Sequence, residues 1–190
     1  MKLSKREVNM HGTIFAELQK YVVSKLGDGA WISLKREAGI GREKYDFFET
    51  YPDGEVNELV AAASRLTGLP AGTLLEDFGA FIAPDLLEMY WAAVQPEWRT
   101  LDLLEHTESA IHEVVRIGQK GATPPYLNAR RTAPDEVTII YTSVRKLCAV
   151  AKGIVRGVAA HYGETVEIDE VSCMLRGDTS CTLQVRAKRA

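Results

Sequence analysis

Apolar residues recur about every 3.6 positions through most of the first half of the chain, which is the period of an amphipathic helix. In the first such segment, Ile14, Leu18 and Val22 fall on one stripe, and Gly27 follows the last apolar residue. Glycine and proline mark the ends of the other periodic segments in the same way. The pattern predicts helices over residues 12–26, 30–38, 56–66 and 71–82, another that begins at Pro84, and a long one over 101–118.

The period changes in the second half of the chain. Residues 126–132 and 136–143 are rich in strand-forming side chains, and 165–175 and 180–187 alternate apolar and polar residues around a turn at 176–178. A helical pattern over 145–162 separates the two pairs. We therefore expect an α+β protein. A helical N-terminal subdomain (about 10–98) precedes a C-terminal subdomain (about 99–190) with a four-stranded antiparallel sheet and helices.

Composition places the chain among ordinary globular proteins. Its 190 residues suit a single domain, and 46% of them are hydrophobic. The net charge of −3 argues against nucleic-acid binding by bulk charge. No apolar run is long enough to predict a membrane helix, and the N-terminus lacks the apolar core of a secretory signal. Three cysteines are too few for a disulfide scaffold, so we expect reduced thiols and a cytoplasmic location.

Two of the four histidines, His106 and His112, lie on the predicted long helix. Six residues of helix turn them about 120° apart, so they cannot share one ligand. His112 lies beside Leu104 and Val115, whereas His106 is on a more mixed face. Periodicity therefore favours His112 as the inward histidine. On this basis alone, a structural role is still the commoner one for a single histidine.

The segment Tyr141-Thr142-Ser143-Val144-Arg145 carries a more specific signal. If it is a strand, its first, third and fifth side chains face one side and bring two hydroxyls and a guanidinium together. Such a set suits an anionic ligand, because arginine offers a bidentate fork to a carboxylate. The alternative interpretation is a solvated strand edge.

Three segments together resemble the haem nitric-oxide/oxygen-binding (H-NOX) domain, which is also the sensor domain of soluble guanylate cyclases. The strongest is the Tyr-x-Ser-x-Arg motif just described. The second is the stretch KGATPP (Lys120–Pro125), and His112 lies nine residues before its first glycine. The third is MHGTI, which begins at Met10, where family members usually start. Residues 1–9 are therefore expected to be an extension or the result of a misassigned start.

The resemblance implies that haem b is bound between the two subdomains. His112 would be the axial ligand of the iron, since a neutral imidazole is a good haem ligand that leaves the opposite face free for a gas. Tyr141, Ser143 and Arg145 would bind the propionates, and Pro125 would press on the porphyrin and distort it. Without the resemblance, the two prolines of the KGATPP stretch predict only a rigid turn.

The resemblance also indicates which gas is bound. Members that bind oxygen stably carry a tyrosine five residues after the motif arginine, and Val150 occupies that position here. Leu18 and Ile82 occupy two further positions at which those members have an aromatic residue and an asparagine, and Ile14 should line the same face. An all-hydrocarbon pocket lacks the hydrogen-bond donor that stabilises bound oxygen. We therefore expect nitric oxide and carbon monoxide to bind, with discrimination against oxygen.

As a member of this family, the chain would signal by conformational change to a separate protein. The partners implied by the resemblance are a histidine kinase or a cyclic-di-GMP enzyme. No nucleophile, acid–base pair or nucleotide-binding glycine motif predicts an enzyme. Two alternatives stay open: a haem-free ligand-binding or scaffold domain of the 4-vinyl-reductase type, which the C-terminal half also resembles, and an oxygen sensor.

The three cysteines are Cys148, Cys173 and Cys181, and the last two flank the predicted hairpin turn. A subset of the family resembles this pattern and holds a structural zinc with three cysteines and one histidine. Here Glu170 stands at the histidine position, and His161 is another candidate for the fourth ligand. A reversible disulfide or ordinary buried thiols are the alternatives to zinc.

Overall fold

The computed structural model describes residues 9–118 and 122–188. They form two compact units, which are described separately. The first comprises the described residues up to Leu74 together with Ala122 and Thr123, and the second comprises Leu75–Gly118 and the described residues from Pro124 onward. Residues 1–8 of the expected extension, and Lys120 and Gly121 of the KGATPP stretch, lie outside the described residues.

The first unit is helical, with a small sheet. Its helices are α1 (Gly12–Leu26), α2 (Ala30–Glu37) and α3 (Asp53–Thr67). The strands β1 (Asn9–His11) and β2 (Thr50–Pro52) pair antiparallel, with Met10 opposite Tyr51. Phe15 is fully buried, and its ring stacks on Tyr45 with 4.2 Å between centroids. The hydrophobic pattern predicts the helices but neither strand, because three residues are too few to establish a period of two.

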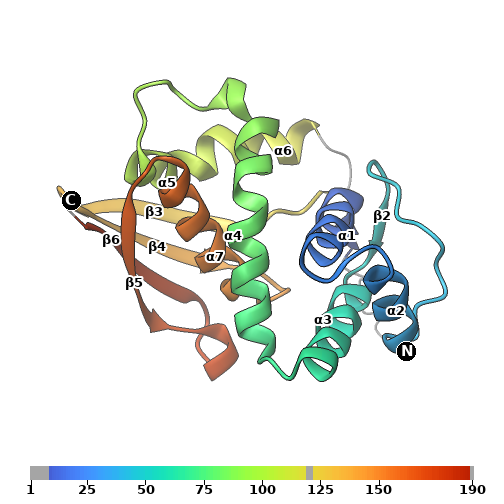
Figure 1. Cartoon of the computed structure of the whole chain (residues 1–190). Coiled ribbons are helices and arrows are strands. Elements are labelled where there is room, and N and C mark those ends of the chain that lie inside the picture. The colour runs from blue at the N-terminus through green and yellow to red at the C-terminus, as the bar shows by residue number, and fades with distance from the viewer. Residues whose placement is uncertain (1–8, 119–121, 189–190) are drawn as a thin grey trace, which may run out of the picture. The chain divides into compact units, whose positions relative to one another are not determined.

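The second unit contains a four-stranded antiparallel sheet in the order β3-β4-β6-β5. The strands are β3 (Tyr126–Ala133), β4 (Glu136–Thr142), β5 (Thr165–Ser172) and β6 (Cys181–Lys188). Figure 1 shows α5 (Thr100–Thr107) and α7 (Cys148–His161) lying across this sheet. One apolar cluster joins the two helices to the two central strands; its buried members are Leu101, Leu104, Val137, Ile139, Val155, Leu183 and Val185. The expected α+β fold class is confirmed.

α4 (Ala71–Met89) is a single helix where the sequence predicts two, with Pro84 inside it. Proline removes one backbone hydrogen bond, but packing stabilises the helix on both sides of it: α7 contacts α4 before Pro84, and Leu87 after it packs against the apolar cluster of Ala83, Leu103 and Val158. The contact is very close, because a Cβ on Gly79 would collide with the carbonyl oxygen of Val150. A Cβ on Gly153 would likewise collide with the carbonyl oxygen of Glu76. The short 3₁₀ turn η1 (Trp91–Ala93) follows.

Gly153→Ala is therefore expected to destabilise the protein by about 1–3 kcal/mol, because the added methyl group must push two helix backbones apart. Gly72→Ala is the matched control: it lies in the first turn of α4, and a Cβ there meets nothing within 4 Å. That variant should be neutral or slightly stabilising, since alanine favours the helix. Thermal unfolding of both variants measures the difference, and equal effects would contradict this packing.

The strand expected over 136–143 ends at Thr142, and the helix expected from Arg145 begins at Cys148. Ser143 and Arg145 therefore lie in a turn, and the expectation that strand alternation aligns them with Tyr141 is wrong. Local hydrogen bonds favour the turn, because the Ser143 hydroxyl accepts the Arg145 N–H at 3.2 Å. The strand predicted up to residue 175 likewise ends early, at Ser172, and the 3₁₀ turn η3 (Met174–Arg176) follows.

The long helix predicted over 101–118 is divided into three pieces. A π-helical turn, η2 (Glu108–His112), separates α5 from α6 (Glu113–Gly118). Its signature is the bond from the Glu113 N–H to the carbonyl oxygen of Glu108, five residues earlier. Such turns are rare and occur frequently at functional sites. Nowhere in 9–118 or 122–188 is there a helix with the length and apolar character needed to cross a membrane.

Candidate functional site

His112 is the last residue of the π-helical turn η2. Its side chain is 16% exposed, and its Nδ1 lies 3.2 Å from Oε2 of Glu108. Burial lowers the pKa of the imidazole, and the hydrogen bond to Glu108 opposes this effect without cancelling it. The ring is therefore neutral near pH 7, which is the form that binds metals.

Glu108 is a partly buried carboxylate that the sequence reasoning missed. Its Oε1 accepts a hydrogen bond from Arg116 at 2.7 Å, and its Oε2 accepts the N–H of Leu127 at 3.0 Å. Burial raises the pKa of the carboxyl group, but these bonds outweigh it and the pKa is lowered. Glu108 thus connects the turn that carries His112 to the start of β3. The only sequence signal for it is its four-residue spacing from His112.

The Tyr-x-Ser-x-Arg motif lies at the same end of the sheet. Leu127, which donates to Glu108, is the direct partner of Tyr141 across β3 and β4. Tyr141 is buried, and burial raises the pKa of its phenol while a hydrogen bond with Ser143 opposes this. Ser143 in turn accepts the Arg145 N–H. The turn after β4 therefore groups these residues, although not by the strand alternation that the sequence predicts.

The side chains of His112 and of the Tyr-x-Ser-x-Arg motif have the chemistry needed to hold a haem. The neutral imidazole of His112 can ligate iron, and two hydroxyls with a guanidinium suit a pair of carboxylates. Pro125 lies next to the histidine. Its carbonyl oxygen accepts a hydrogen bond from Arg116 Nη2 at 3.0 Å, and it also interacts with the His112 ring, which acts to raise the pKa of that ring. All of these residues belong to the second compact unit.

The predicted distal-pocket residues are divided between the two units. Ile82, on α4, is 1% exposed, and Val150, on α7, is half-buried at the close contact with Gly79. Ile14 and Leu18 lie on α1 of the first unit, where Leu18 is buried. All four are apolar, as the prediction of a hydrocarbon pocket requires; their place around a ligand stays a prediction.

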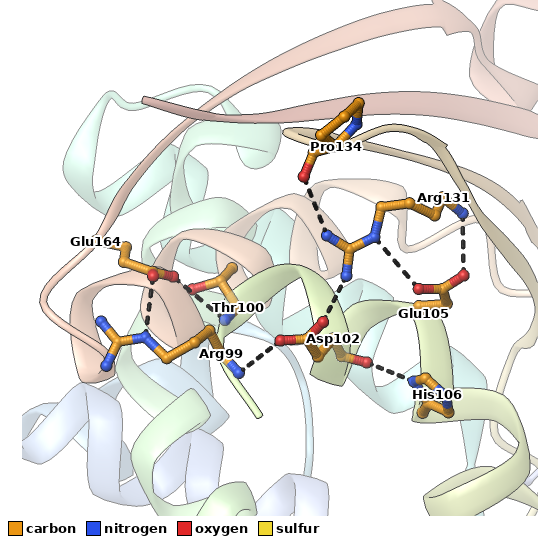
Figure 2. A network of polar contacts seen from close by, with 8 residues as sticks. All are labelled: Arg99, Thr100, Asp102, Glu105, His106, Arg131, Pro134 and Glu164. Carbon is orange, nitrogen blue, oxygen red and sulfur yellow. Dashed lines mark hydrogen bonds and ion pairs between the residues drawn. The ribbon is translucent and has the colours of Figure 1, made fainter. Parts of the chain in front are cut away.

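His106 belongs to a separate polar network, which Figure 2 shows. Its Nδ1 lies 2.8 Å from the carbonyl oxygen of Asp102, and its ring stacks on Trp98 at 4.7 Å. In the same network Arg131 of β3 pairs with Asp102 at 2.6 Å and with Glu105 at 3.3 Å. The network attaches α5 to the sheet and accounts for His106 as a structural residue.

The three cysteines meet beside the sheet. Cys173 Sγ lies 3.6 Å from Cys148 Sγ and 3.9 Å from Cys181 Sγ, and all three thiols are unpaired and buried. A carboxylate oxygen of Glu170 joins them, so four potential ligand atoms lie within 4.8 Å of one another. His161, the other candidate for a fourth ligand, is not a member of this group.

This cluster has the chemistry of a zinc site. Oε1 of Glu170 is buried without a hydrogen-bond partner among the described residues, and Lys152 Nζ lies 3.5 Å from it. Burial raises the pKa of the Cys148 thiol to about 12 and also raises that of Cys181. Without an ion these thiols are protonated, and a zinc ion would displace their protons.

The fold is that of H-NOX domains. The structure is similar to an H-NOX protein from S. oneidensis in the Fe(II)NO state, with 23% identity, coverage of 95% of this chain and 100% of that one, and a TM-score of 0.88. Two further structures are similar. An H-NOX mutant from T. tengcongensis has 21% identity, coverage of 95% of this chain and 98% of that one, and a TM-score of 0.82. The unliganded Fe(II) H-NOX protein from K. algicida has 20% identity, the same two coverages and a TM-score of 0.80.

The Haem-NO-binding family model matches residues 11–170. The chain therefore belongs to the Haem-NO-binding family. Among curated protein sequences, none matches this chain.

Proposed function

We propose that this protein is a haem-based sensor that binds nitric oxide on ferrous haem and discriminates against oxygen. The observation that carries the proposal is the connection from His112 through Glu108 and Leu127 to Tyr141. It joins a partly buried imidazole to the side chains proposed to bind the propionates, within one compact unit. Family membership supports haem as the ligand that needs both.

In this proposal each residue has a separate task. His112 ligates the iron through Nε2, and Tyr141, Ser143 and Arg145 bind the propionates. Pro125 contacts the porphyrin beside the histidine. When bound, the haem would supply an iron that can take up a diatomic gas.

Signalling requires two conformations that the gas stabilises unequally. His112 would hold the haem through the turn η2, so a gas-dependent loss of that attachment would leave η2 and α6 free to move. The polar network around Arg131 would keep α5 on the sheet meanwhile.

We propose that a separate protein detects this change, either a histidine kinase or a cyclic-di-GMP enzyme. The chain is then a non-catalytic module, and its three free thiols suit the cytoplasm.

Exposure of the ferrous protein to air tests the gas selectivity. The four residues predicted to face the gas, Ile14, Leu18, Ile82 and Val150, carry no hydrogen-bond donor in their side chains. We therefore expect nitric oxide and carbon monoxide complexes but no stable oxygen complex. Val150→Tyr should raise oxygen affinity about 10- to 100-fold, the worth of one charge-assisted hydrogen bond.

Val150→Phe is the matched control, because it adds the same ring without the hydroxyl group. Absorption spectra of the three ferrous proteins under carbon monoxide, nitric oxide and air measure the outcome. A stable oxygen complex in the unsubstituted protein would favour the oxygen-sensor alternative. A chain that takes up no haem would favour the haem-free alternative.

We also propose that the cysteine cluster binds one structural zinc ion, with Glu170 as the fourth ligand. The cluster supports this with three converging thiols and a buried carboxylate oxygen that lacks a hydrogen bond among the described residues. Oxidation of the thiols would release the ion and add a redox input to the sensor.

A further inference from the structure

Glu108 is partly buried beside His112, and both of its carboxylate oxygens accept hydrogen bonds. Its side chain is 16% exposed. Oε2 lies between His112 Nδ1 and the N–H of Leu127, and Oε1 faces Arg116. Burying a carboxylate is costly unless it is paired and hydrogen-bonded, and this one is both. The arrangement holds a negative charge against one nitrogen of the imidazole.

That charge determines where the ring carries its proton. An ionised carboxylate only accepts hydrogen bonds, and it is a stronger acceptor than the neutral carbonyl oxygen of Pro125, which also interacts with the ring. The neutral ring is therefore expected to donate from Nδ1 to Glu108 and to keep the free lone pair on Nε2. Histidines that ligate metals usually donate their other N–H to a carboxylate or carbonyl, and this raises their basicity. A ring that donates from Nδ1 to Glu108 is in the tautomer that a metal ligand requires.

We propose that Glu108 is the positioning residue for His112: its carboxylate fixes the tautomer of the imidazole and sets how strongly that ring holds the iron. This inference rests on the proposed haem-binding function. A more basic histidine resists displacement, so Glu108 would determine how much of the protein releases His112 when nitric oxide binds. The sensor's response would then depend on a residue that touches neither haem nor gas.

A merely structural role for Glu108 is the competing explanation, because the same carboxylate joins η2 to β3. Glu108→Gln separates the two roles. The glutamine amide oxygen can still accept from Leu127 and His112, but the negative charge is gone. Glu105→Gln is the matched control: Glu105 lies one turn earlier and is also paired with an arginine, Arg131. It removes the same charge without contact to the histidine.

The first measurement is the ¹⁵N NMR spectrum of His112 in the full chain before haem is added. We expect the Nδ1-protonated form in the unsubstituted protein and a shift toward the Nε2-protonated form in Glu108→Ala. Glu105→Gln should leave the spectrum of His112 unchanged. An Nε2-protonated ring in the unsubstituted chain would overturn the inference, whether or not the protein binds haem.

The second measurement is the iron–histidine stretching frequency of the ferrous haem-loaded protein, by resonance Raman spectroscopy. Glu108→Gln should lower this frequency, weaken haem binding about 10- to 100-fold and increase the fraction that releases His112 under nitric oxide. Glu108→Asp, which restores the charge, should recover part of the frequency. A purely structural role would not produce this recovery.

The two proposals fail in different ways. If Glu108→Gln retains His112 on the iron with an unchanged frequency, the role of Glu108 is overturned and the sensor function stands. If the unsubstituted chain takes up no haem, the sensor function is overturned, while the tautomer measurement still decides whether Glu108 positions His112.

Discussion

His112→Gly is expected to abolish stable haem binding. Loss of a hydrogen bond that supports a metal ligand costs about 10- to 100-fold in affinity, and loss of the ligand itself should cost more. The Soret band of the purified variant should be weak or absent, and free imidazole in the buffer should restore it by occupying the vacated position. Absorption spectra and haem titration of the variant measure both effects.

His106→Gly is the matched control for this experiment. It lies on the same run of helical turns and carries the same cost of about 1 kcal/mol for glycine in a helix. Its imidazole is engaged with the carbonyl oxygen of Asp102 and the ring of Trp98. This variant should retain haem. If His106→Gly loses haem and His112→Gly keeps it, the assignment of the ligand is wrong.

The choice between these two histidines illustrates how far the sequence alone could lead. Helical periodicity only favoured His112, whereas the resemblance to the H-NOX family selected it through the spacing to the KGATPP stretch. The structure adds a physical difference, since His112 is partly buried against a carboxylate and His106 is an exposed residue of a polar network. Periodicity does not reveal the neighbours that distinguish the two histidines. Leu127, which bonds to Glu108 beside His112, and Trp98, which stacks on His106, come into contact only through tertiary folding.

The helices and strands that could be predicted are those whose hydrophobic pattern lies within the element itself. The sheet strands and most helices follow from patterns that extend over seven or more residues. β1 and β2 were missed because their pairing joins Met10 to Tyr51 across some forty residues, with only three residues in each strand. Pro84 was misjudged because tertiary packing against α7 maintains α4 through it. The end of β4 depends on the hydrogen bond from Arg145 to Ser143, which a pattern of hydrophobicity does not record.

Glu108 was missed for a related reason. An acidic residue four positions before a histidine on a helix is ordinarily a surface pair worth little. Here the π-helical turn and the start of β3 enclose it, and Arg116 and Leu127 complete its hydrogen bonds. The same spacing therefore has a different meaning once the environment is known.

Removal of the cysteine cluster is the second change with a large expected effect. We expect the protein, purified under reducing conditions, to contain about one zinc per chain, and Cys148→Ser to contain none. An ion present at 100 times its Kd stabilises the fold by about 2.7 kcal/mol. For a chain of this size its loss corresponds to a decrease in Tm of about 5–10 °C. Elemental analysis and thermal unfolding measure the two effects.

Glu170→Gln and His161→Ala identify the fourth ligand. Glu170 contributes a ligand atom to the cluster, whereas His161 stands outside it with its ring against Tyr162. Glu170→Gln should therefore lower zinc affinity, and His161→Ala should leave the ion in place. Glu170 also pairs with Lys152 and Arg176, so Glu170→Gln breaks two ion pairs as well. Lys152→Met controls for this, because it removes one pair and keeps the carboxylate; zinc lost from it as readily as from Glu170→Gln would contradict ligation by Glu170.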